Sequence, residues 1–169
     1  PHSLTEYVRF AQFLATVPDE KEATRMLLDS IDAAKDLLLE HDVLLPSDTA
    51  SDHSMVHSLF SQFLSVVAEA GNTKSELFFQ YAGVLKTHVD ALAASISSVA
   101  QALKAPHFAS LTATPATLVA ELDSLREQLA SIGDHATEYA EYLDALGMPP
   151  SPVLELGDLP SQLDALAAV

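Results

Sequence analysis

The chain contains no cysteine and no tryptophan, and only 5 of its 169 residues are glycine. Without cysteine it can form neither a disulfide, nor a thiolate nucleophile, nor a cysteine-ligated zinc site, which fits a reducing compartment. Basic residues are scarce as well, since 8 lysines and arginines stand against 24 aspartates and glutamates, for a formal net charge of -16. Because this charge repels a phosphate backbone and an anionic membrane surface, we expect neither nucleic acid nor a membrane as a partner.

Apolar residues are plentiful but well distributed. They make up 49% of the sequence, and no run of them approaches the roughly 18 residues of a membrane span. This composition indicates an ordered chain and not an acidic disordered tail. No lysine or arginine follows Arg126, so the last quarter of the sequence is strongly negative. A solvated acidic face explains this pattern, with docking to a basic partner as the alternative.

The apolar spacing predicts helices throughout, since no alternation of period two with turn residues is present. Apolar residues at positions 4, 7, 8, 11 and 14 predict a first helix that stops near Pro18. A second helix is expected over residues 19–42, with three acidic residues in its first turn and a stripe that runs through Leu27, Ile31, Ala34 and Leu38. Residues 43–50, which include Pro46, read as a loop.

A long helix is expected over residues 51–104. Apolar steps of three and four lead up to Gly71-Asn72, which resembles a helix stop, and the same seven-residue phase continues beyond it. A loop has no reason to keep this phase, so one helix, weakened or kinked at Gly71, is the preferred interpretation. Two helices in a tight hairpin are the alternative. The stripe includes Val56, Phe60, Phe63, Val67, Ala70, Leu77, Tyr81, Val84, His88, Ala91, Ser95 and Val99.

The next helix begins at Thr114-Pro115, with threonine as N-cap and proline in the first turn, and it stops at Gly147 and the prolines that follow. Its apolar seam is the cleanest in the chain and has the heptad spacing of a coiled coil: Leu118, Leu122, Leu125, Leu129, Ile132, Ala136, Tyr139, Leu143, Leu146. A short helix near residues 159–169 follows, with little left to pack on.

These elements predict an all-α fold: an elongated antiparallel helical bundle of long helices, spectrin-like or coiled-coil, with a short C-terminal helix. Residues 1–150 would form the bundle, and residues 151–169 an extended segment and helix leading toward a further domain. We expect a rod, and a chain that is part of a larger protein.

Few residues have the spacing of a chemical site. No phosphate-binding glycine loop, zinc-protease helix or nucleophile elbow is present. His53 and His57, four apart and beside Asp52, could share a helix face and hold a metal, but no third ligand is evident, so two surface histidines are the preferred interpretation. His88 is expected to be buried on the apolar stripe. Packing roles are expected for Phe60, Phe63, Phe78, Phe79, Tyr81, Tyr139 and Tyr142. No catalytic, cofactor-binding or metal-binding residue, and no cofactor, is predicted.

The order of these features resembles a known family. Residues 31–43 (IDAAKDLLLEHDV) form a helix end before an acidic, proline-containing loop, and residues 59–64 (LFSQFL) place an aromatic, Phe63, on the long helix. Residues 79–89 (FQYAGVLKTHV) precede a proline-bearing break, and residues 143–149 (LDALGMP) close the last long helix. This arrangement, over roughly residues 7–166, is similar to the tail of dynein heavy chains just before the linker, and it looks closer to axonemal than to cytoplasmic heavy chains.

The resemblance implies a non-catalytic segment, because the ATPase sites of that family lie in AAA+ modules whose motifs do not occur here. It implies a bundle that links the motor to the docking base in microtubule-based motility, in the cytoskeleton and specifically the axoneme of a cilium or flagellum. The implied partners are other heavy chains, intermediate or light chains and docking proteins. An unrelated spectrin- or vinculin-like adaptor that binds a partner protein is the main alternative, because the same seams arise from packing alone. A metal- or ligand-binding four-helix-bundle enzyme is the third interpretation.

Overall fold

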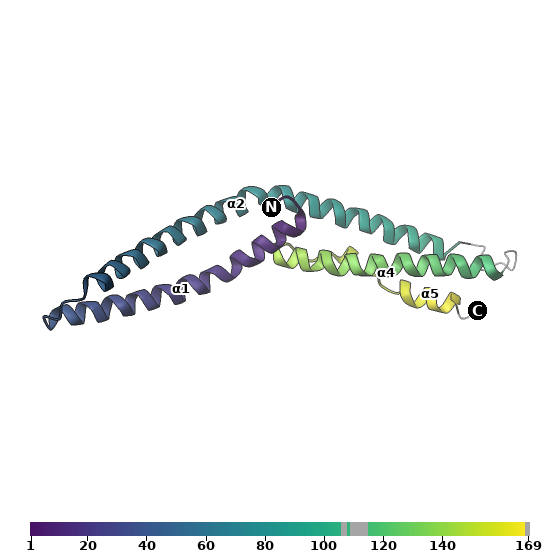
Figure 1. Cartoon of the computed structure of the whole chain (residues 1–169). Coiled ribbons are helices and arrows are strands. Elements are labelled where there is room, and N and C mark those ends of the chain that lie inside the picture. Colours follow the sequence, from purple (N-terminus) through teal and green to yellow (C-terminus); the bar gives the residue numbers. More distant parts are fainter. Residues whose placement is uncertain (106–107, 109–114, 168–169) are drawn as a thin grey trace. The chain divides into compact units, whose positions relative to one another are not determined.

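A computed structural model describes residues 1–105, 108 and 115–167 of the chain. In this part of the chain the regular structure is helical, with four α-helices, one short 3₁₀ helix and no strand (Figure 1). The all-α fold with long helices and a short C-terminal helix is therefore confirmed. The chain divides into two compact units, the N-terminal unit Pro1–Phe79 and the C-terminal unit Gln80–Val169.

Helix α1 covers Leu4–Glu40 without a break. The Ser3 side chain caps its start by accepting a hydrogen bond from the backbone N–H of Glu6, at 3.2 Å. The prediction that a helix ends near Pro18 is wrong, because Pro18 lies inside α1. A proline removes only one backbone donor, and the turns on either side supply enough hydrogen bonds and packing to keep a 37-residue helix continuous.

The end of α1 is set by the backbone. Asp42 has a positive φ of 57°, and its N–H donates to the Leu39 carbonyl while the Val43 N–H donates to the Leu38 carbonyl. This pair of bonds is the Schellman arrangement that satisfies the last carbonyls of a helix. The connection that follows is short, since α2 begins at Ser47 and not near residue 51 as the sequence predicted.

Helix α2 covers Ser47–Leu103 and passes through Gly71 without interruption. One long helix at this point is therefore confirmed, and the hairpin alternative at Gly71-Asn72 is wrong. In the N-terminal unit, α1 and the first part of α2 run antiparallel from the connection at residues 41–46 (Figure 1). The Tyr7 hydroxyl donates to the Lys74 carbonyl at 2.7 Å and so joins the start of α1 to the middle of α2.

The buried face of α2 in the C-terminal unit differs from the predicted stripe. Its buried residues are Tyr81, Leu85, Val89, Leu92, Val99 and Leu103. Of the predicted residues in this stretch only Tyr81 and Val99 are buried, while Val84, His88, Ala91 and Ser95 are exposed. Leucines and valines one position further along take the core positions.

Helix α4 covers Pro115–Ala145, and the preceding Thr114 lies outside the described residues. Its predicted seam is confirmed at seven of nine positions, while Leu118 and Tyr139 are half-buried. The buried positions are Leu122, Leu125, Leu129, Ile132, Ala136, Leu143 and Leu146. Gly147 ends the helix with a φ of 65° and the same pair of bonds as at Asp42, because the N–H groups of Gly147 and Met148 donate to the carbonyls of Asp144 and Leu143.

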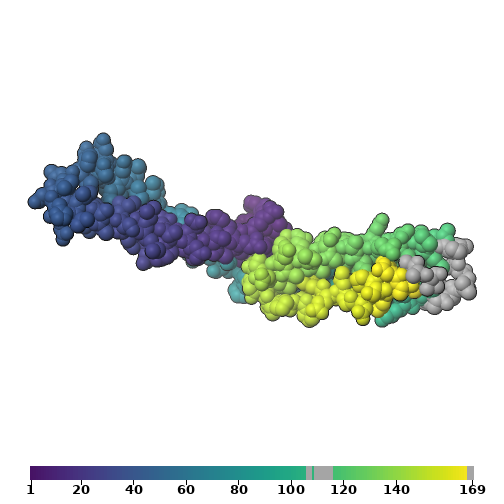
Figure 2. All heavy atoms as spheres, turned by 90° about the horizontal axis from the view of Figure 1, so that it is seen from below, coloured from purple at the N-terminus to yellow at the C-terminus, as the bar shows by residue number. Residues whose placement is uncertain are grey.

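The 3₁₀ helix η1 (Pro152–Leu154) leads to helix α5, Leu159–Ala167. The expectation that α5 has little to pack on is wrong. Leu159 and Leu163 are buried in one cluster with residues of α2 and α4, and Figure 2 shows the yellow atoms of α5 along the green atoms of α4. Among the described helices, none has the length and apolarity needed to cross a bilayer.

Candidate functional site

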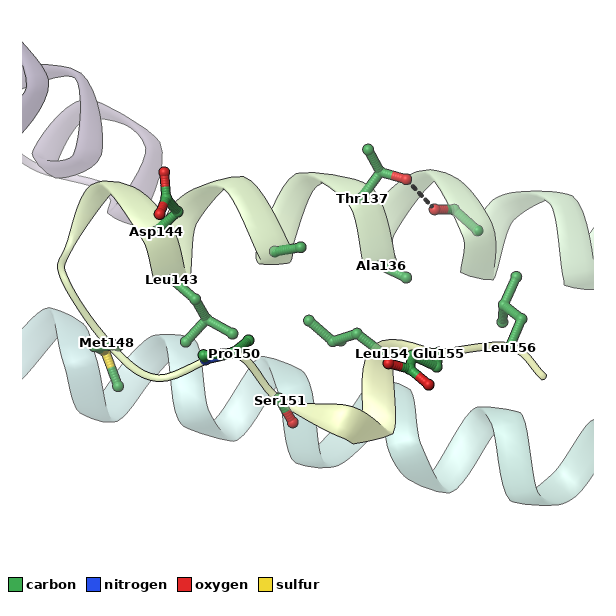
Figure 3. A pocket seen from close by; sticks show the side chains of 12 residues that line it. Ala136, Thr137, Leu143, Asp144, Met148, Pro150, Ser151, Leu154, Glu155 and Leu156 are labelled. Carbon is green, nitrogen blue, oxygen red and sulfur yellow. Dashed lines mark hydrogen bonds between the residues drawn. The ribbon is translucent and has the colours of Figure 1, made fainter.

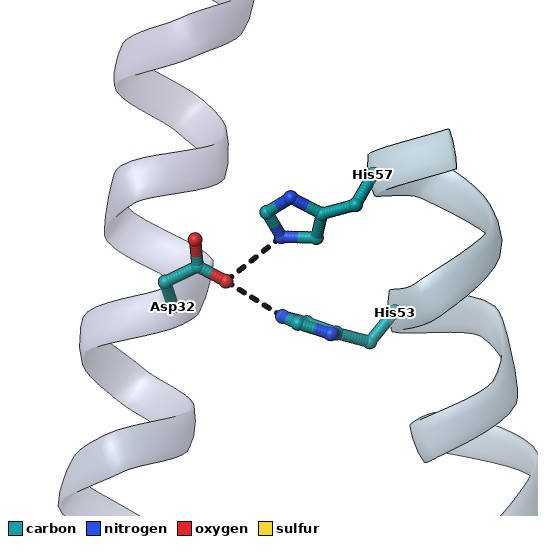
Figure 4. Close-up of side chains that lie close together, drawn as sticks. All are labelled: Asp32, His53 and His57. Carbon is teal, nitrogen blue, oxygen red and sulfur yellow. Dashed lines mark hydrogen bonds and ion pairs between the residues drawn. The ribbon is translucent and has the colours of Figure 1, made fainter. Parts of the chain in front are cut away.

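Two histidines of α2 meet one aspartate of α1 near the connected end of the helical hairpin. His53 and His57 are four residues apart, so both side chains leave the same face of α2. The Nε2 atom of His53 lies 2.6 Å from Oδ1 of Asp32, and Nε2 of His57 lies 2.9 Å from the same oxygen (Figure 4). A single carboxylate oxygen thus holds both rings.

The cluster is partly open to solvent. The exposed fraction of the side chain is 15% for His53, 39% for His57 and 41% for Asp32. The two imidazole centroids are 4.6 Å apart with their planes at 49°, so the rings do not stack. The hydrogen bonds from the two histidines hold the pKa of the Asp32 carboxyl below its ordinary value, because they favour the ionised form.

An apolar groove of about 340 Å³ adjoins this cluster. Leucine, isoleucine, valine and alanine side chains of the two helices and their connection line most of it, and His53 and His57 lie at its wall. Lys35 and Asp52 also line the groove and add charges of opposite sign. The groove therefore offers an apolar surface next to three possible metal ligands.

A second groove lies in the C-terminal unit, between α4 and residues 148–156, and has a volume of about 590 Å³. Ala136 and Leu143 point into it from α4, and Leu154 and Leu156 face them from the opposite segment (Figure 3). The hydroxyl of Thr137, which lines the groove, already donates to the Gly133 carbonyl at 3.0 Å. This groove is a packing surface, and its lining includes no histidine, lysine or arginine.

The remaining candidates have structural surroundings. His88 is exposed and not buried as predicted, and its ring lies 5.6 Å from that of Tyr139. Tyr139 and Tyr142 are half-buried, and the Tyr142 hydroxyl donates to a Glu138 carboxylate oxygen, which agrees with packing roles.

The predicted aromatic core of α2 is confirmed only in part. Tyr81 is buried, and Phe60 and Phe78 are half-buried. Phe79 is 82% exposed and Phe63 is 36% exposed, so the prediction of core positions is wrong for these two. In a helix that packs on one side only, a second apolar face stays in solvent.

Asp32 is the residue that the sequence did not reveal as a member of this cluster. The signal was present in the hairpin geometry. Residues equally far from the connection between α1 and α2 lie opposite each other in an antiparallel pair, which sets Asp32 opposite a point between His53 and His57. The sequence alone does not show that the connection spans residues 41–46, so it does not show that Asp32 lies opposite the two histidines.

Comparison with known proteins finds no relative of this chain. No family model matches the chain, and no curated protein or solved structure matches it.

Proposed function

We propose that this chain is a non-catalytic structural segment that binds a partner protein through its N-terminal unit. The observation that carries the proposal is the exposed apolar surface of that unit. Large hydrophobic side chains with more than half of their surface exposed occur on both helices and their connection: Phe13, Met26, Leu27, Leu37, Leu44, Met55, Leu59, Val66 and Phe79. Surfaces of this kind mark interaction sites in proteins that are otherwise monomeric.

Sparse burial in the same unit supports this function. No residue between 29 and 80 is buried, although the segment contains the last third of α1, more than half of α2 and many leucines, valines and phenylalanines. Two helices alone cannot enclose an apolar core, whereas a third or fourth helix laid along them can. An additional helical element would therefore complete the packing.

Charge favours a basic partner over a second copy of the chain. The N-terminal unit has 13 aspartates and glutamates against 5 lysines and arginines. A second copy would bring the same negative charge to the interface, and like charges across an interface oppose association. The occupant that fits is an amphipathic helix with an apolar stripe and flanking lysines or arginines.

A model peptide tests the proposal. We expect a labelled helical peptide of leucine and lysine to bind the full chain in fluorescence anisotropy, with an affinity that falls as salt is added. A peptide of leucine and glutamate with the same pattern serves as the control and should not bind. Absence of binding by the lysine peptide would contradict the proposal.

Matched variants separate apolar docking from simple charge attraction. Phe13→Asp/Leu27→Asp adds two charges at side chains that are 66% and 63% exposed, so the fold should persist. Ala116→Asp/Ala120→Asp adds the same charges at exposed positions of α4, in the C-terminal unit and outside the proposed surface. We expect only the first variant to lose most of the affinity. Equal losses would mean that charge alone drives binding and would count against an apolar docking surface.

We further propose that this segment belongs to a dynein heavy chain tail, where it would contact other heavy chains, intermediate or light chains or docking proteins of a cytoskeletal, axonemal motor. The support is the order of helices and motifs in the sequence, at residues 31–43, 59–64, 79–89 and 143–149. The sequence of the parent gene tests this assignment. A linker and AAA+ modules downstream are the expected result, and their absence would leave the unrelated helical adaptor.

A further inference from the structure

We propose that Asp32, His53 and His57 form a binding site for a divalent transition metal ion, with zinc as the best-fitting ion. The donor atoms of the three side chains all lie within 4.8 Å of one another, and they come from two helices that the ion would hold together. This inference is independent of the partner-binding surface proposed above.

The ligand types select the class of metal. Two imidazole nitrogens and one carboxylate oxygen suit zinc, copper, nickel or ferrous iron, whereas magnesium and calcium prefer sites made of oxygen atoms alone. Three protein ligands are also the number found in zinc sites that keep a fourth position for water. The histidine spacing of four residues allows both Nε2 atoms to reach one ion from one helix face.

Small movements convert the hydrogen-bonded cluster into a coordination site. Zinc takes its nitrogen and oxygen ligands at about 2.0–2.2 Å, so tetrahedral donor atoms lie roughly 3.3 Å apart. The Nε2–Oδ1 distances are 2.6 Å and 2.9 Å, so each nitrogen has to move by less than about 1 Å from the carboxylate oxygen. The exposure of His57 and Asp32 leaves room for this movement and a path for the ion.

The charged side chains near the cluster do not oppose binding of the ion. Lys35 and Asp52 line the adjoining groove, and their opposite charges largely offset each other near the ion. When zinc binds the Nε2 atoms, they no longer donate to Asp32, and each neutral imidazole carries its hydrogen on Nδ1 instead. Asp32 then neutralises part of the charge of the ion.

Calorimetric titration of the full chain with zinc at neutral pH tests the proposal. An excess of magnesium in the buffer occupies the many surface carboxylates, which have no selectivity for zinc. We expect one zinc ion per chain and a rise in the midpoint of thermal unfolding as zinc is added, because the ion binds the folded hairpin. A titration without heat and without a shift in the unfolding midpoint would overturn the site.

Variants assign the binding to these residues. His53→Ala/His57→Ala should weaken zinc binding by at least about 100-fold, since loss of an outer-shell partner alone commonly costs 10- to 100-fold. The control His41→Ala/His135→Ala also removes two histidines, both exposed and away from the cluster, and should bind zinc as the unaltered chain does. Equal affinities in the two double variants would overturn the assignment.

The Asp32→Asn variant distinguishes the loss of a metal ligand from the unfolding of the hairpin. The amide oxygen can still accept both histidine hydrogen bonds, so the hairpin should keep its helical circular dichroism, while the weaker ligand should lower the zinc affinity. A variant that stays helical and binds zinc as tightly as the unaltered chain would show that Asp32 is no ligand. Light scattering with zinc present should give an unchanged molar mass, because half an ion per chain with dimer formation would place the ion between chains and overturn the proposal.

Discussion

Tyr7 connects the start of α1 to α2 with a single buried hydroxyl. Its side chain has no exposed surface, and the hydroxyl donates to the Lys74 carbonyl at 2.7 Å. Burial raises the pKa of this phenol above its ordinary value of 10.0, because the phenolate loses solvation there. A carbonyl inside a helix is already bonded to its own helix, so this bond adds a tertiary contact to a helical one.

Replacement of this hydroxyl should have a pH-dependent effect. We expect Tyr7→Phe to lower the free energy of unfolding by about 1 kcal/mol at neutral pH, which is the usual net value of one hydrogen bond. The folded pKa is the higher one, so the contribution of the neutral phenol is complete below about pH 10 and is lost as the pH rises through the folded pKa. Urea unfolding of both proteins near pH 8 and near pH 11 measures the difference, which should shrink at the higher pH. A difference that is constant with pH would contradict the burial of an un-ionised phenol.

Only two of the three residues of the proposed metal site could be predicted as neighbours from the sequence. The pair His53 and His57 is visible from spacing alone, since a helix brings positions four apart together. Asp32 is 21 residues away from His53 in the chain. Its proximity depends on where the hairpin turns, and the turn is set by the positive φ of Asp42, a residue type that takes this conformation less often than glycine.

At the scale of elements, the buried faces of α4 and α2 differ in how well the sequence predicts them. Most large apolar residues of α4 lie on one face, with the exposed Val119 as an exception, so counting them finds the buried side. On α2 alanines and serines are spread around the helix between residues 91 and 100. These small residues fit either a core or a surface. The prediction kept the seven-residue phase of the first part of α2, which placed the stripe on Val84, His88 and Ala91, one position before the buried Leu85, Val89 and Leu92.

Pro18 provides the test of α1 as one helix. Because proline lacks an N–H and its ring crowds the carbonyl four residues earlier, its removal should stabilise a continuous helix. We expect Pro18→Ala to raise the free energy of unfolding by about 1–3 kcal/mol, as followed by far-ultraviolet circular dichroism. Ser30→Ala, at an exposed position of the same helix, should change it by no more than about 0.5 kcal/mol. No gain at Pro18 would mean that α1 is broken there in solution, as the sequence alone suggested.

For the whole molecule, the distribution of buried side chains predicts unequal stability. The C-terminal unit has a continuous apolar cluster that joins α2, α4 and α5. The N-terminal unit has buried residues only at positions 4–28, and its connected end relies on the hydrogen bonds of Asp32 with His53 and His57. Regions with few buried apolar contacts open at a low free energy, without unfolding of the rest.

Hydrogen exchange measures this inequality directly. We expect amides of residues 30–60 to exchange well before those of residues 122–143, because helices that pack against few neighbours open locally while the three-helix cluster opens only with its unit. Zinc should slow exchange around positions 32, 53 and 57 and leave residues 122–143 unchanged, whereas a basic amphipathic peptide should protect α1 more broadly. Uniform exchange along both units would show that they unfold together, and it would contradict the unequal stability inferred from burial.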